Sequence, residues 1–242
     1  MDPVYQKVKS CPSRLKNERD LYVPVRQFWQ AQGYDVKAEV DYVDVLAVRD
    51  NHMVAIELKL NINFDLLLQA SNRQQYMDYV YVAVPKRGRT LYTARWQKIC
   101  ALLKRLGIGL LLVGEDMLGE LAVQLMFEAK AVDSVQRFNP RRRTKIFEEF
   151  TGREGDANVG GSVGVPIMTV YRQKSFLVAK ALSQGPQTLR QLRARNLLAC
   201  ETVLQKNAYG WFVRVGRGSY ALSEKGREAL GTWNEDPSPE NH

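Results

Sequence analysis

Short apolar runs separated by polar turns alternate with segments of helical spacing over the first half of the chain. The apolar runs predict strands at residues 34–40, 43–48, 54–60, 79–84 and 108–113. Apolar residues three or four positions apart predict helices at residues 13–32, 65–77, 93–106 and 115–131. Pro24 falls inside the first helix, so we expect a kink or a break there. This order of elements predicts an α/β fold with a mixed sheet flanked by helices.

The last third of the chain has a different pattern. Helical spacing predicts helices at residues 169–182, 188–193 and 199–207. Two apolar segments, 211–215 and 219–222, flank a glycine-containing turn and predict a hairpin, and residues 223–230 close the unit. Three helices followed by a hairpin are typical of a small winged-helix domain, which we place at residues 166–232.

A glycine-rich segment separates the two patterns. Residues 151–164 contain almost no large apolar side chains. We interpret residues 151–165 as a flexible linker between a first domain, residues 1–150, and the winged helix. The alternative interpretation is a nest of backbone amides that grips a phosphate group. Residues 233–242 form an acidic tail.

The charge of the chain predicts a polyanionic partner. The net charge is +9, and residues 166–230 hold 11 Lys/Arg against 3 Asp/Glu, so +8 of the excess lies there. We therefore expect nucleic acid, DNA in the first place, as the partner. The predicted contacts lie on the second and third helices and on the hairpin: Arg193, Lys206, Arg214 and Arg217. Winged helices also serve as docking or dimerisation modules, so a homodimer is the alternative use of this unit.

The residue types that the chain lacks exclude several kinds of chemistry. Its three cysteines are far apart, with no CxxC pair, and indicate neither a zinc site nor a disulfide framework. Its two histidines, His52 and His242, exclude His-based metal cages and Ser-His-Asp triads. The polar N-terminus is not a signal peptide, and no apolar run is long enough to span a membrane. A cytoplasmic protein is expected.

Asp44, Glu57 and Lys59 carry the candidate chemistry. Asp44 lies in the strand at 43–48, and the other two lie near the end of the strand at 54–60, across a polar turn. Side chains alternate along a strand, so Glu57 and Lys59 share a face. Two acids and a lysine on one sheet surface can hold a divalent ion beside an activated water. The alternative is an exposed strand end with a solvated ion pair.

These residues resemble the signature of the PD-(D/E)xK nuclease superfamily, which includes restriction endonucleases and Holliday junction resolvases. Asp44 matches the first acid of that signature, and Glu57-Leu58-Lys59 matches its (D/E)xK, although Val43 stands where the proline is expected. The whole chain is similar to a bacterial family of unknown function described as putative PD-(D/E)xK phosphodiesterases. The resemblance implies a restriction-endonuclease-like core and a metal-dependent hydrolase.

The resemblance also implies roles for single residues. Asp44 and Glu57, with the carbonyl of Leu58, would bind Mg²⁺ or Mn²⁺, and Lys59 would orient the attacking water. Glu18 resembles an acid that some members of the superfamily add from the first helix. The alternative is that Glu18 is a charged side chain on the helix surface that contacts only solvent.

Three further polar residues are candidates from their spacing. Gln69 and Arg73 are four apart on the helix at 65–77, so they share a face. They could contact the site or the substrate backbone. It is equally possible that they are polar side chains that simply face the solvent. Asp41 would take the place of Asp44 as the first acid of the site if the register of the strands differed from the one predicted here. Two functions therefore stay open: a metal-dependent nuclease, and a non-catalytic nucleic-acid-binding regulator on a nuclease-like core.

Overall fold

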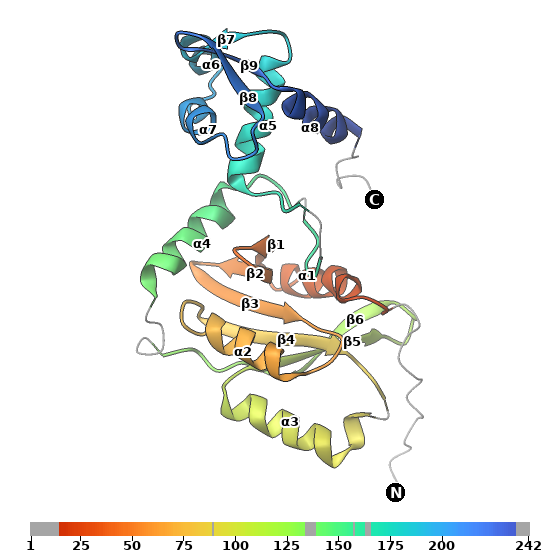
Figure 1. Cartoon of the computed structure of the whole chain (residues 1–242). Coiled ribbons are helices and arrows are strands. Elements are labelled where there is room, and N and C mark those ends of the chain that lie inside the picture. Colours follow the sequence, from red (N-terminus) through yellow and green to blue (C-terminus); the bar gives the residue numbers. More distant parts are fainter. Residues whose placement is uncertain (1–14, 89, 134–138, 157, 163–165, 236–242) are drawn as a thin grey trace, which may run out of the picture. The chain divides into compact units, whose positions relative to one another are not determined.

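The computed structural model describes residues 15–88, 90–133, 139–156, 158–162 and 166–235 (Figure 1). The chain folds as two compact units. The first contains Met1–Thr151 and Asn158–Ile167, and the second contains Gly152–Ala157 and Met168–His242. The segment interpreted as a linker, residues 151–165, is thus divided between the two units.

A six-stranded mixed sheet forms the centre of the first unit. Its strands lie side by side in chain order. They are β1 (Asp35–Val40), β2 (Val43–Arg49), β3 (His52–Leu58), β4 (Tyr79–Pro85), β5 (Gly109–Glu115) and β6 (Leu121–Phe127). Strands β1 to β3 pair antiparallel, β3 to β5 pair parallel, and β6 pairs antiparallel with β5. The predicted mixed sheet is confirmed.

Helices cover both faces of this sheet. They are η1 (Glu18–Leu21), α1 (Tyr22–Gln30), α2 (Phe64–Arg73), η2 (Thr90–Tyr92), α3 (Ala94–Arg105) and α4 (Pro140–Gly152). Apolar side chains of α1, such as Trp29, pack with Val45 and Ile56 on one face. Helices α2, α3 and α4 contribute to the core on the other face (Figure 1). Both faces of the central strands are therefore buried, which fits their nearly continuous apolar sequences.

Two sequence predictions need correction, and one element was missed. Residues 115–131 were expected to be a helix, but Leu121–Phe127 forms the edge strand β6. Helix α4 was not predicted. The first predicted helix begins outside the described residues and is divided into η1 and α1, with Pro24 in the first turn of α1. No helical hydrogen bond is required from a backbone nitrogen at that position, so Pro24 fits the first turn of α1, and the predicted helix is interrupted before it, between Leu21 and Tyr22.

The second unit combines helices with a small antiparallel sheet. Its elements are α5 (Val170–Leu182), β7 (Gln187–Thr188), α6 (Leu189–Ala194), α7 (Cys200–Lys206), β8 (Phe212–Gly216), β9 (Ser219–Leu222) and α8 (Glu224–Glu235). The strand order is β7-β9-β8. Helix α8 continues to Glu235, beyond the predicted end at residue 230, and the rest of the predicted tail lies outside the described residues. Across the described part of the chain, no helix could cross a membrane.

Candidate active site

Asp44 and Glu57 are brought together by the pairing of β2 with β3. In this antiparallel pair Val45 lies opposite Ile56, and the same register sets Asp44 opposite Glu57. The backbone N–H of Leu58 donates to Asp44 Oδ2 at 2.8 Å. Cβ atoms of directly opposed residues are about 5 Å apart. The two acids predicted from the sequence therefore occupy neighbouring positions on the sheet.

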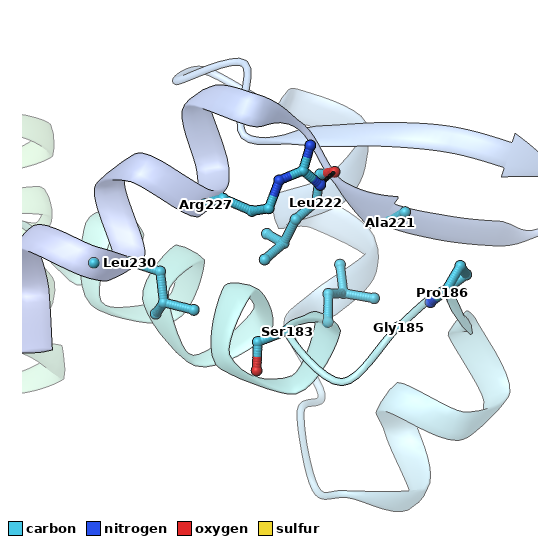
Figure 2. Close-up of a pocket in the computed structure, with 9 residues that line it drawn as sticks. Ser183, Gly185, Pro186, Ala221, Leu222, Arg227 and Leu230 are labelled. Carbon is cyan, nitrogen blue, oxygen red and sulfur yellow. Dashed lines mark hydrogen bonds between the residues drawn. The ribbon is translucent and has the colours of Figure 1, made fainter.

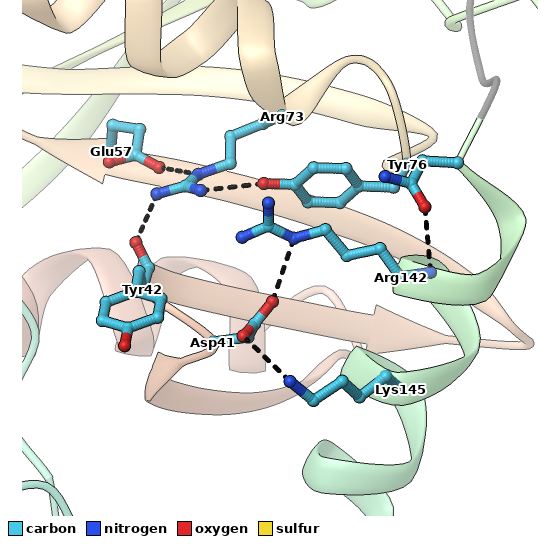
Figure 3. Close-up of polar contacts among 8 residues, drawn as sticks. Asp41, Tyr42, Glu57, Arg73, Tyr76, Arg142 and Lys145 are labelled. Atoms are coloured by element: carbon cyan, nitrogen blue, oxygen red, sulfur yellow. Dashed lines mark hydrogen bonds and ion pairs between the residues drawn. The ribbon is translucent and has the colours of Figure 1, made fainter.

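Glu57 is buried and paired with Arg73 of α2 (Figure 3). Arg73 Nε donates to Glu57 Oε1 at 2.6 Å, and only 2% of the Glu57 side chain is exposed. The remaining nitrogens of Arg73 donate to the hydroxyl of Tyr76, at 2.8 Å, and to the carbonyl of Tyr42. Of the two roles expected for Arg73, contact with the site or with the substrate backbone, the structure has the first, because its guanidinium binds Glu57.

Lys59 and Glu18 form the accessible side of the site. Lys59 Nζ lies 2.9 Å from Glu18 Oε2, with 21% and 28% of these two side chains exposed. Lys59 follows the end of β3, and Glu18 opens η1, so the contact joins the sheet to the first helical segment. Glu18 is therefore bound to Lys59 rather than being a free solvated charge.

The charges of the site shift the pKa values of its members. Burial, together with the nearby negative charge of Glu57, raises the pKa of Asp44 to about 7. Burial alone would lower the pKa of Lys59, but the hydrogen bond to Glu18 and the charge of Asp44 outweigh it and raise that pKa. Near neutral pH, Lys59 is therefore a cation, and Asp44 is close to its titration point.

A tight turn from the glycine-rich segment closes over these residues. A Cβ atom on Gly160 would lie 2.6 Å from the backbone oxygen of Asp44 and 3.2 Å from a side-chain carbon of Leu58. Gly161, at φ +73°, packs against Glu18 in the same way, with 3.0 Å to its Cβ. The flexible-linker interpretation therefore does not hold for Gly160 and Gly161, which pack against the elements that carry the acids.

Glu39 anchors this turn and was missed by the sequence analysis. Its Oε1 accepts from the backbone N–H of Ser162 at 3.3 Å. Glu39 is buried, and its φ of +52° is unusual for a glutamate inside a strand. The β1–β2 register, with Ala38 opposite Val45 and Val40 opposite Val43, sets Glu39 opposite Asp44. No local sequence signal marks this contact, because Glu39 and Ser162 are 123 residues apart in the chain.

The two remaining sequence candidates of the first unit have different surroundings. Asp41 lies 3.1 Å from Arg142 Nε and 4.0 Å from Lys145 Nζ, so it is held by α4 and does not replace Asp44 (Figure 3). Gln69 lies one turn before Arg73 on α2. Its Oε1 is buried and has no hydrogen-bond partner among the described residues. A buried amide oxygen without a partner is costly, so this atom is suited to a ligand or a water.

The donor atoms of the site fit a hydrated divalent cation. Mg²⁺ prefers oxygen ligands, keeps several waters and is commonly bound by one or two carboxylates. Asp44 and Glu57 supply two carboxylates, and that of Glu57 already accepts from Arg73. Within the described residues, no three His, Cys, Asp or Glu side chains cluster to hold a metal ion. The donor set therefore suits a water-rich site and not a closed protein cage.

The predicted nucleic-acid contacts lie in the second unit. Arg193 pairs with Glu201, and Lys206 Nζ lies 4.8 Å from the centre of the Tyr171 ring. Arg214 and Arg217 are exposed on and between the strands of the β8–β9 hairpin. The hairpin arginines are thus better placed for a ligand than Arg193, whose charge is already paired.

The second unit also contains an open hollow between α5, β9 and α8 (Figure 2). Its volume is about 400 Å³. Most of its lining is small or apolar, and its one charged residue, Arg227, donates to the backbone oxygen of Leu222 at 3.1 Å. The hydroxyl of Ser183 in the lining donates to the backbone oxygen of Lys180 at 2.8 Å, and the lining holds no acid or histidine to activate it, so the hollow adds no candidate for hydrolysis.

Comparison with known proteins gives one match. The sequence family described as "Putative PD-(D/E)XK phosphodiesterase" matches residues 117–229, a little under half of the chain. Neither a curated protein nor a solved structure matches significantly. The matched segment contains Gly160 and Gly161 but begins after Asp44, Glu57 and Lys59. The assignment of these acids therefore rests on their signature and geometry.

Proposed function

We propose that this chain, whose residues 117–229 match the family described as putative PD-(D/E)XK phosphodiesterase, hydrolyses phosphodiester bonds in nucleic acid with a divalent cation. The observation that carries the proposal is the placement of Asp44 opposite Glu57, beside the bonded pair of Lys59 and Glu18. Two acids next to a protonated amine supply both a cation site and a positive charge for the phosphate.

Asp44 and Glu57 would hold the cation, with the Leu58 carbonyl and Gln69 as neutral oxygen donors. A bound Mg²⁺ or Mn²⁺ would lower the pKa of a coordinated water and offset phosphate charge. The pKa of about 7 on Asp44 supports this use, because burial, with a smaller effect of Glu57, makes the carboxylate costly to ionise unless a cation lies beside it.

Lys59 acts as a fixed cation in this proposal and not as a base. Its raised pKa keeps the amine protonated at neutral pH, and its partial exposure lets a phosphate oxygen approach. Glu18 orients the amine through the 2.9 Å contact. In the reaction, water forms a new bond to phosphorus, one ester P–O bond breaks, and the departing oxygen takes up a proton.

The second unit would bind the nucleic acid. We propose that it is a winged helix, because a helix, a short strand, two helices and a hairpin follow one another in that order. Its excess positive charge and the exposed Arg214 and Arg217 favour contact with phosphates. DNA is the substrate proposed first, and RNA is the alternative that the experiment must include.

A substrate screen tests this proposal. The full chain is incubated with labelled single- and double-stranded DNA and RNA, with Mg²⁺, with Mn²⁺ and with excess chelator. We expect cleavage of at least one substrate with metal and none with chelator. His52→Ala, a change outside the site, should cleave as the unchanged protein does.

A non-catalytic regulator is the second candidate, and the buried ion pair of Glu57 with Arg73 favours it. The charge of Glu57 is already compensated, and its side chain is almost inaccessible. This candidate predicts tight, salt-sensitive binding in the same screen without cleavage under any metal condition.

A further inference from the structure

Tyr42 adopts an unfavourable backbone conformation at the tip of the β1–β2 hairpin. Val40 pairs with Val43, so Asp41 and Tyr42 form a two-residue turn, with φ of +47° and +67°. Such turns favour asparagine and glycine, and a bulky residue at positive φ is a rare exception. The second hairpin of the sheet turns at Asp50 and Asn51, which suits this geometry better.

The turn at Tyr42 is fixed from both sides (Figure 3). The carbonyl of Tyr42 accepts from Arg73, which also holds Glu57. Asp41 is held by Arg142 at 3.1 Å and lies 4.0 Å from Lys145. Strained residues persist where their surroundings over-determine them, and such strain occurs often at ligand sites. The network therefore ties the position of Tyr42 to the acid site.

The Tyr42 side chain is unpacked in spite of this strain. The residue is 74% exposed, so burial of the ring does not compensate for the backbone cost. Lys145, bonded to the same turn, has a side chain that is 76% exposed. An exposed aromatic ring and an exposed cation held at the same turn can together bind an unpaired nucleotide, with the base stacked on the ring and a phosphate near the cation.

We propose that Tyr42 is a stacking site for one unpaired nucleobase, with Lys145 as its phosphate contact. The proposal rests on the function proposed above, because it makes nucleic acid the ligand, but it does not depend on hydrolysis. Tyr76 and Tyr81, in contrast, are buried and are therefore not available for stacking.

The test uses the full chain with excess chelator, so that binding is measured without cleavage. The probes are a single-stranded oligonucleotide containing 2-aminopurine and a fully paired duplex. Tyr42→Asn should weaken single-strand binding by about fivefold or more, with loss of 2-aminopurine quenching and little change for the duplex. Tyr42→Phe keeps the ring and should bind as the unchanged protein. Lys145→Gln should lower the slope of log affinity against log salt by about 0.7.

Stability separates a ligand site from an ordinary exposed side chain. Tyr42→Asn and Tyr42→Gly remove the strain and should raise Tm by about 2–4 °C, even though they weaken binding. Asn51→Gly is the matched control in the other turn and should leave affinity unchanged. If the Tyr42 variants bind the single strand as tightly as the unchanged protein, the stacking proposal is overturned. Cleavage by those variants, measured separately with metal, shows whether the proposed hydrolysis stands independently.

Discussion

Arg73 Nε lies 2.6 Å from Glu57 Oε1, so the acid that matches the (D/E)xK signature is held by a buried guanidinium. The pair joins α2 to β3 and brings the carbonyl of Tyr42 into the same network. Attraction to Glu57 outweighs the effect of burial and raises the pKa of Arg73, so this arginine stays charged. A cation at the site must therefore share Glu57 with Arg73 or displace it.

Removing Arg73 should destabilise the metal-free protein strongly. Arg73→Met leaves the carboxylate of Glu57 buried without its partner, a change that costs about 3–5 kcal/mol in comparable pairs. Chemical unfolding measures the loss, and Arg193→Met, which breaks an exposed pair with Glu201, is the control expected to cost about 1 kcal/mol or less. Combining Arg73→Met with Glu57→Met should recover part of the stability. A loss as small as that of the control would refute a buried, charged pair.

Most strands of the first unit could be predicted from the sequence, whereas the edge strand β6 and helix α4 could not. Strands β4 and β5 are continuous apolar runs. Such runs are typical of parallel strands buried on both faces, so these two strands could be predicted from the sequence. Strand β6 is an edge strand whose side chains are mostly half-buried or exposed, so it lacks an alternating pattern. Its leucine, alanine and methionine favour a helix, and pairing with β5 overrides that preference.

The features of the site that were missed depend on contacts between distant residues. The spacing of Gln69 and Arg73 predicted a shared face, but not that Arg73 would be bound to Glu57. Gly160 and Gly161 looked like parts of a linker because glycine favours both flexible chain and tight packing. The structure shows that tight packing applies here, because Gly160 lies against Asp44 and Gly161 against Glu18, which are both distant in the sequence.

Affinity for a divalent cation should depend on pH through Asp44. Because the pKa of Asp44 is raised to about 7, a proton competes with the cation below that pH. Mn²⁺ affinity, measured by calorimetry, should fall by up to about tenfold per pH unit below 7 and level off above about 8. Asp44→Asn should bind weakly at every pH. A flat profile in the unchanged protein would show that Asp44 is not a ligand.

Without divalent ions, the carboxyl group of Asp44 should make the free energy of unfolding fall as pH rises. The pKa of Asp44 in the folded state lies above its ordinary value of 3.8, so the folded protein holds this proton more tightly than the unfolded chain. Its contribution is complete below about pH 4 and is lost as pH rises through 7, with a size on the order of a few kcal/mol. Asp44→Asn, which still accepts from Leu58, should remove this dependence from the unfolding free energy measured between pH 4 and 8.

Adding one methyl group at Gly160 should disturb the site. Gly160→Ala would place its Cβ 2.6 Å from the backbone oxygen of Asp44, so the turn or β2 must shift. We expect weaker Mn²⁺ binding and slower cleavage while the circular dichroism spectrum stays folded. Gly231→Ala is the control, because a Cβ there meets nothing within 4 Å. Equal metal affinity in the two variants would mean that the turn does not position Asp44.

The hairpin arginines should determine the salt dependence of duplex binding. Each phosphate contact contributes about 0.9 to the slope of log affinity against log salt for duplex DNA. Arg214→Ala with Arg217→Ala should therefore lower the slope by up to about 2, whereas Arg95→Ala with Lys98→Ala, an equal change of charge on α3, should alter it little. An unchanged slope in the double variant would favour a docking or dimerisation role for the second unit.

Single-turnover cleavage by Glu57→Gln tests the central claim most directly. The change keeps the shape of the side chain and an oxygen for Arg73, but removes the negative charge proposed to hold the cation. We predict that cleavage with Mn²⁺ falls by about two orders of magnitude or more, while nucleic-acid affinity in chelator stays as in the unchanged protein. Cleavage that persists in Glu57→Gln at the original rate, or in the unchanged protein with excess chelator, would contradict the account.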